Sequence, residues 1–156
     1  MQHETHGGWR PEPDRFIRIL DDPVLRAVVL LQDLVTRTTV DFWSRRGVLN
    51  LYLPITTSSV SSPMGLGSDS EPVAIDLFGV KSFLADSMQF MLEYGCRFSA
   101  DGTWYLMPSF RGEDCDATHL NQFFHSEAEI SGGLDEVIAT VEAYVRALAE
   151  AVLTEL

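Results

Sequence analysis

The spacing of apolar residues predicts two long amphipathic helices, one toward each end of the chain. Across residues 23–46, Val, Leu, Phe and Trp recur at three- and four-residue steps, which is the period of one helix face. Residues 134–156 carry a similar apolar stripe and also predict a helix. Pro23 suits a first helical turn, and Gly47 suits the left-handed residue that often follows a last turn. The first helix is therefore expected to end just before Gly47.

Between these helices the chain has short β-rich runs separated by turn residues. Strands are expected at residues 48–55, 73–78, 80–84, 104–107 and 123–130. A short helix is expected at residues 87–94, and residues 56–72, dense in Ser, Thr, Gly and Pro, predict a long loop. Helix, strands and then helix is the order typical of an α+β fold, with a mostly antiparallel sheet flanked by helices.

Length and composition are those of one globular domain. The chain has 156 residues, of which 46% are hydrophobic and 22% charged. Residues 1–13 are polar and are expected to form a flexible leader, so residues 14–156 form the predicted domain. The chain shows no apolar signal segment, no run of ~20 apolar residues and no cysteine framework, so we expect a cytoplasmic protein without membrane contact.

The charge balance argues against stable binding of nucleic acid. Lys and Arg number 11 against 23 Asp and Glu, which gives a formal net charge of −12. Affinity for DNA or RNA comes largely from cations that neutralise phosphates. A strongly acidic surface repels a polyanion, so small molecules and other proteins are the expected partners.

Candidate chemistry is concentrated in residues 109–123. Two strands joined by a polar loop would bring Arg111, Glu113, His119 and Phe123 together. A guanidinium is a planar fork that suits phosphate oxygens, and a phenyl ring offers a face on which a base can stack. This combination favours a nucleotide site.

The same residues resemble motif 2 of class II aminoacyl-tRNA synthetases. That motif has an F-R-x-E strand, a loop and an H-L-x-x-F return strand, which match residues 110–113 and 119–123. The acidic continuation, residues 124–130, resembles the asparaginyl and aspartyl enzymes and their relative, archaeal asparagine synthetase. Upstream, residues 23–54 are similar to motif 1, which forms the dimer interface of that class. Residues 62–69 are similar to its mobile substrate loop.

The resemblance implies ATP as a cosubstrate and assigns its binding residues. Arg111 would hold the α-phosphate and the substrate carboxylate, and Phe123 would stack on adenine. Glu113 would help to fix ATP, and His119 would lie near the β- and γ-phosphates. Arg111, Glu113 and His119 are therefore the expected catalytic residues.

The resemblance also assigns an amino-acid pocket. The segment F-L-x-x-S-x-Q at residues 83–89 is similar to the one that contacts the amino acid, so Ser87 and Gln89 would face the substrate. Glu127 and Glu129 would hold either the substrate ammonium group or Mg²⁺, so Glu127 is an expected substrate-binding residue and both are expected metal ligands. Aspartate is not the expected substrate, because Leu92 occupies the position where aspartate enzymes have a lysine.

No segment resembles motif 3, so the resemblance implies a synthetase core truncated before that motif. We expect one subunit of a tRNA-independent, ATP-dependent, adenylate-forming amide or ester ligase that acts on an amino or carboxylic acid. A partner chain would carry motif 3, and the 23–46 helix and the strand ending at Pro54 would form a dimer. The alternatives are an inactive regulatory or scaffold subunit and an amino-acid-binding paralogue.

Overall fold

The computed structural model describes residues 15–58, 71–114 and 118–155. The helices are α1 (Arg15–Asp21), α2 (Pro23–Ser44), α3 (Gln89–Gly95) and α4 (Leu134–Glu155). The strands are β1 (Leu49–Asn50), β2 (Thr56–Thr57), β3 (Val73–Leu77), β4 (Val80–Leu84), β5 (Thr103–Phe110) and β6 (Gln122–Glu129). The predicted α+β class is confirmed, and every strand pair except the parallel pair β1–β5 is antiparallel.

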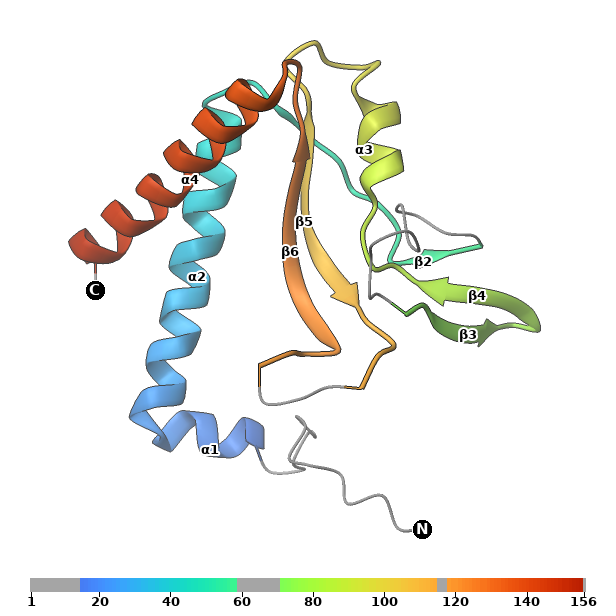
Figure 1. Cartoon of the computed structure of the whole chain (residues 1–156). Coiled ribbons are helices and arrows are strands. Elements are labelled where there is room, and N and C mark those ends of the chain that lie inside the picture. Colours follow the sequence, from blue (N-terminus) through green and yellow to red (C-terminus); the bar gives the residue numbers. More distant parts are fainter. Residues whose placement is uncertain (1–14, 59–70, 115–117, 156) are drawn as a thin grey trace.

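The antiparallel pair β5–β6 is the centre of the fold. Its register runs from Thr103 opposite Glu129 to Phe110 opposite Gln122, and β1 lies parallel beside β5. Because directly opposite residues share a face, the pair presents two distinct surfaces. Helices α2 and α4 lie on one side of it and α3 lies on the other (Figure 1).

The side of β5 that faces α2 and α4 is aromatic and apolar. Trp104 is 3% exposed, and its ring stacks on that of Trp43 with 6.3 Å between centroids. Phe42 and Tyr144 complete this cluster, with ring centroids 5.1 Å apart. The Tyr144 hydroxyl also lies 2.7 Å from Thr39 Oγ1, so a hydrogen bond joins α2 to α4 inside the apolar layer.

The opposite side of β5 packs against α3 and the segment before it. Ala85, Met88, Leu92, Tyr105 and Met107 form this second buried cluster. Thr103 Oγ1 donates to Leu92 O at 2.8 Å and so joins the helix to the strand. This cluster holds the predicted amino-acid segment against the centre of the sheet.

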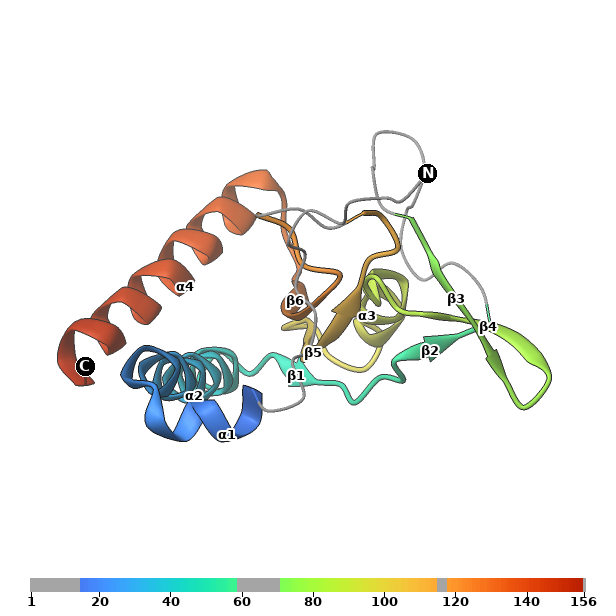
Figure 2. The same ribbon diagram turned by 90° about the horizontal axis from the view of Figure 1, so that it is seen from below.

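A second small sheet, of order β2-β4-β3, extends away from the core (Figure 2). The predicted hairpin is confirmed, with Val73 opposite Leu84 and Leu77 opposite Val80. At its tip Phe78 and Gly79 have φ of 55° and 80°, as a tight two-residue hairpin turn requires. The tip therefore projects Phe78 almost fully into solvent.

Three details of the strand prediction were wrong. The strand expected at residues 48–55 pairs only at Leu49–Asn50, Thr56–Thr57 form β2 inside the expected loop, and the sheet is divided into two. After Leu51 donates to Trp104 O, the segment leaves β5, and Pro54 has no N–H with which to continue a ladder. Helix α1 was not predicted, and the predictions for residues 1–13 and 62–69 lie outside the described residues.

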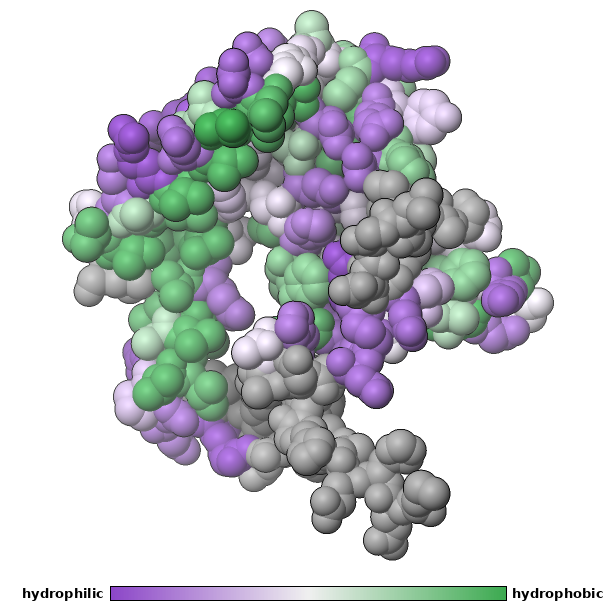
Figure 3. Space-filling model, viewed as in Figure 1, coloured by the Kyte–Doolittle hydropathy of each residue, from purple (hydrophilic) through white to green (hydrophobic). Residues whose placement is uncertain are grey.

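The long helices were predicted correctly, but much of their apolar surface is exposed. Asp22 caps α2 by accepting from the N–H groups of Val24 and Leu25. On α4 the stripe residues Val141 and Val145 are 53% and 57% exposed. Figure 3 shows apolar side chains gathered over α4 and α2 on one face of the molecule. None of the described helices is long and apolar enough to cross a bilayer.

Two glycines with positive φ, Gly102 and Gly79, allow a matched test of how closely the backbone approaches Gly102 beside the β5–β6 pair. A Cβ at Gly102 would lie 2.2 Å from the backbone oxygen of Glu129, whereas a Cβ at Gly79 meets nothing within 4 Å. Gly102→Ala should lower the free energy of unfolding by about 2–5 kcal/mol, since strain and a backbone clash add. Gly79→Ala should cost only about 1–2 kcal/mol. Equal losses in urea unfolding would contradict the close approach at Gly102.

Candidate active site

A hydrogen-bond network on the α3 side of the sheet surrounds the Glu127 carboxylate. Ser87 Oγ lies 2.7 Å from Glu127 Oε2 and 3.0 Å from Oε1, and donates to that carboxylate. The Tyr105 hydroxyl also donates to Oε2. Both hydroxyls accept from backbone N–H groups at 3.0 Å, Tyr105 from Met88 and Ser87 from Gln89. The segment before α3 therefore orients both donors.

This network leaves part of the Glu127 carboxylate available to a ligand. Burial raises the pKa of the Tyr105 hydroxyl, and its hydrogen bond to Glu127 raises the pKa further, so the hydroxyl remains a neutral donor. A carboxylate has about four acceptor positions, and the two hydroxyls do not fill all of them. The remaining edge of Glu127 suits an ammonium group.

Arg111 lies at the end of β5 between a buried acid and an aromatic ring. Its Nη1 is 3.5 Å from Asp86 Oδ2, and its Cζ is 5.7 Å from the centre of the Phe123 ring. The Asp86 side chain is 6% exposed, so its charge requires a nearby cation. The Phe110 N–H donates to Ala85 O at 2.9 Å, which brings the Asp86 segment to this strand end.

Glu113 lies just beyond Arg111, and its carboxylate accepts from the backbone. Its Oε2 accepts from the Glu71 N–H at 3.0 Å, while the Gly112 N–H donates to Glu71 O at 2.8 Å. The N–H of Glu71 is the main cause of a lowered pKa at Glu113, and the charges of Arg111 and His119 lower it further. These hydrogen bonds of Gly112 and Glu113 therefore join the segment after β5 to Glu71.

The structure places the remaining predicted residues at different distances from this centre. His119 is exposed in the loop, and its Nδ1 is 3.1 Å from Thr118 Oγ1. Gln89 is partly buried, and its amide donates to Glu93 Oε1 at 3.2 Å. Ser87 and Glu127 are in direct contact, Arg111 lies near Phe123, and His119 is close enough to Glu113 to lower its pKa.

The geometry around Glu127 and Glu129 does not by itself form a Mg²⁺ site. Hydroxyl donors already occupy part of the Glu127 carboxylate. Burial raises the pKa of Glu129, and the charges of Glu93 and Glu127 add to that rise. In the described ranges, no cluster of three or more His, Cys, Asp or Glu could hold a metal ion. Metal binding by Glu127 and Glu129 stays a prediction.

Three side chains of this site were missed in the sequence. Asp86 and Tyr105 contact Arg111 and Glu127, as described above. His125 Nδ1 lies 3.3 Å from Ser109 Oγ and 4.0 Å from Glu127 Oε2. Strand alternation places His125 on the same face as Glu127, which was the available signal. Tyr105 is identified only through the register of β5 against β6.

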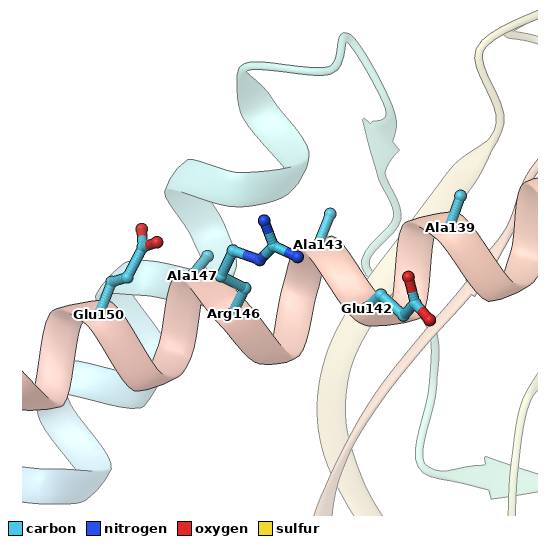
Figure 4. A pocket seen from close by; sticks show the side chains of 6 residues that line it. All are labelled: Ala139, Glu142, Ala143, Arg146, Ala147 and Glu150. Atoms are coloured by element: carbon cyan, nitrogen blue, oxygen red, sulfur yellow. The ribbon is translucent and has the colours of Figure 1, made fainter.

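A separate hollow on α4 lies away from this network (Figure 4). It is lined by Ala139, Glu142, Ala143, Arg146, Ala147 and Glu150. None of the predicted site residues lines it, and Arg146 stands between carboxylates one turn away on either side. Two of its lining residues, Ala143 and Ala147, also pack against the aromatic cluster. The candidate active site remains the face around Arg111 and Glu127.

The fold is that of a class II synthetase core. Residues 12–156 match the family described as tRNA synthetases class II (D, K and N), so the chain belongs to that family. The chain is 30% identical over 124 residues to an asparagine–tRNA ligase of Streptococcus thermophilus, covering 78% of this chain and 26% of that protein. A ligase of the same name from Streptococcus pneumoniae is 29% identical over 129 residues, covering 81% and 28%.

Solved structures share the fold. The asparaginyl-tRNA synthetase of Pyrococcus horikoshii, complexed with asparaginyl-adenylate, matches with a TM-score of 0.79 and 21% identity, covering 93% of this chain and 33% of that one. The Entamoeba histolytica enzyme in complex with asparaginyl-adenylate matches with a TM-score of 0.74 and 16% identity, covering 97% and 34%. The chain thus spans about a quarter of the length of the curated relatives and a third of these structures.

Removing the Tyr105 hydroxyl tests the network. Tyr105→Phe leaves the buried Met88 N–H without its acceptor and removes one donor to Glu127. The free energy of unfolding should fall by about 1–3 kcal/mol in urea titrations. Tyr94→Phe is the control, because Tyr94 is 62% exposed on α3, and its stability should not change. Equal stability of Tyr105→Phe and the unaltered protein would contradict the network.

Proposed function

We propose that this chain is a subunit of an ATP-dependent ligase that activates an amino acid or another carboxylic acid as its adenylate. The observation that carries the proposal is one sheet face with Arg111 beside Phe123 at one end and Ser87 with Glu127 at the other. Such a face has groups suited to a phosphate, a base and an ammonium. The two related asparaginyl-tRNA synthetases were solved in complex with asparaginyl-adenylate, which supports this class of reaction.

In the proposed first step, the substrate carboxylate attacks the α-phosphorus of ATP. A bond forms between a carboxylate oxygen and phosphorus, the bond to the β-phosphate oxygen breaks, and pyrophosphate leaves. Arg111 holds the carboxylate and α-phosphate with its fork, and Phe123 positions the base. A bound Mg²⁺ would neutralise phosphate charge. In the second step an amine, ammonia or a hydroxyl attacks the acyl carbon and AMP leaves, which gives an amide or an ester.

We propose that the acceptor is not tRNA. The formal net charge of −12 gives the chain no overall attraction for a polyanion. Asp86, Glu113 and Glu127 add carboxylates to the proposed site itself. A small amine or hydroxyl compound is not repelled in this way.

We also propose that a partner chain carrying motif 3 completes the site. The exposed apolar residues of α2 and α4, among them Val28, Leu30, Val141 and Val145, support a protein contact. The α2 segment, which resembles the dimer motif, would in addition join two copies of this chain. An inactive scaffold or an amino-acid-binding paralogue would keep the contact without the chemistry.

Purification from the host through an affinity tag, followed by ATP–pyrophosphate exchange with a panel of amino acids, tests the proposal. A stoichiometric partner should co-purify, and one or more acids should support exchange. Arg111→Ala should abolish that exchange, because the α-phosphate loses its cation. The chain should stay folded, with a lower free energy of unfolding because Asp86 loses its partner. Arg97→Ala is the control, since Arg97 is exposed just after α3 and lies over the Tyr94 ring, outside the proposed site. Unchanged exchange in Arg111→Ala would refute the site, and an inactive homodimer would favour the scaffold or binding alternatives.

Phe123→Ala tests the position of the base. If adenine stacks on this ring, ATP binding measured by calorimetry should weaken by about 1–3 kcal/mol, as base–aromatic stacks do elsewhere. Phe124→Ala is the matched control, because Phe124 is the next residue of β6, lies on the other face and is 71% exposed. Equal ATP affinity of Phe123→Ala and the unaltered protein would make Phe123 a packing residue only.

A further inference from the structure

His125 lies between two proposed binding groups on one face of β6. Alternate residues of a strand share a face and are about 7 Å apart. Phe123, His125 and Glu127 therefore follow one another along this face, and Ser109 lies opposite Phe123 on β5. The ring of His125 has its centroid 6.0 Å from that of Phe123 and 6.3 Å from that of Tyr105.

The hydroxyl of Ser109 lies against Nδ1 of His125. Ser109 is 0% exposed, and its Oγ is 3.3 Å from His125 Nδ1. Over residues 15–58, 71–114 and 118–155, this is the one hydrogen bond found for the Ser109 side chain. A buried hydroxyl needs an acceptor, and a neutral imidazole has one unprotonated nitrogen to offer. We therefore assign the proton to Nε2.

Nε2 lies at the far end of a ring whose side chain is 31% exposed. Within the described part of the chain it has no hydrogen-bond partner. The neighbouring Glu127 carboxylate is 4.0 Å from Nδ1, the nitrogen that faces Ser109, and not from Nε2. Its Oε2 already accepts hydrogen bonds from Ser87 and Tyr105. The Nε2–H group is therefore a neutral donor left for a ligand.

We propose that His125 Nε2–H donates a hydrogen bond to an oxygen of the α-phosphate, and that Ser109 is the positioning residue that fixes this tautomer. The inference rests on the proposed function. A base on Phe123 and an ammonium on Glu127 would each lie about 7 Å along the strand from His125, so the phosphate and acyl groups between them would lie over its ring. A fixed donor there stabilises the charge that develops on phosphate oxygens during attack and needs no change of protonation.

Binding of AMP and adenosine to the chain, with any partner that co-purifies, tests the donor without turnover. His125→Leu should weaken AMP binding about 10- to 100-fold, since a hydrogen bond to a charged group is lost, and should leave adenosine binding unchanged. ATP–pyrophosphate exchange should fall about 100-fold or more. His125→Gln restores an N–H close to the position of Nε2 and should recover most of the AMP affinity and most of the exchange rate. The AMP affinity and exchange rate of Ser109→Ala should lie between those of the unaltered protein and of His125→Leu, because the His125 tautomer is no longer fixed.

Ser126→Ala is the control variant, since Ser126 is the next residue of β6 and lies on the opposite face. Equal AMP affinity of His125→Leu and the unaltered protein would overturn the inference. A loss in His125→Gln as large as that in His125→Leu would also overturn it, because the ring would then act by packing alone. If the unaltered protein binds neither adenosine nor AMP and catalyses no exchange, the proposed function itself fails, and the role of His125 falls with it.

Discussion

The register of β5 against β6 is the constraint on which both the core and the candidate site depend. It directs Trp104 into the aromatic layer of α2 and α4, and it directs Tyr105 to the opposite side, against Glu127. A slip of one residue would exchange these faces. The Trp104 indole would then lie among carboxylates, and the Tyr105 network would lie in an apolar layer without partners. Packing of the core and polarity of the site therefore select the same register.

The site is assembled from segments that are distant in sequence, and backbone groups join them. Ser87 meets Glu127 across 40 residues, and the Met88 N–H meets the Tyr105 hydroxyl across 17. Each hydroxyl accepts a hydrogen bond from a backbone N–H and donates one to the Glu127 carboxylate. Because such bonds polarise one another, the acceptor orientation of Glu127 is fixed before any ligand binds. The fold thus prepares the cation end of the site with hydroxyl donors around Glu127.

The sequence predicted what depends on local pattern and missed what depends on register and burial. Helical period identified α2 and α4, and turn chemistry identified the β3–β4 hairpin. Motif spacing led to Arg111, Phe123 and Glu127, but not to Asp86, whose contact with Arg111 exists only because Phe110 binds Ala85. Periodicity also showed that α4 is amphipathic without showing that much of its apolar stripe would remain exposed, since a period does not specify a neighbour.

The balance of charge on the active face indicates how a nucleotide would have to be held there. Arg111 supplies a guanidinium, but Asp86 lies 3.5 Å from it, and Glu113 and Glu127 add negative charge nearby. A polyphosphate placed on this face would meet carboxylates as well as the arginine, and like charges in a partly buried site repel strongly. A neutral donor can bind a phosphate oxygen at this face, which is a physical reason for the proposed role of His125 in one fixed tautomer. The remaining compensation for the β- and γ-phosphates would have to come from bound Mg²⁺ or from cations of the proposed partner. The acidic face therefore fits the ammonium of a substrate better than it fits an isolated triphosphate.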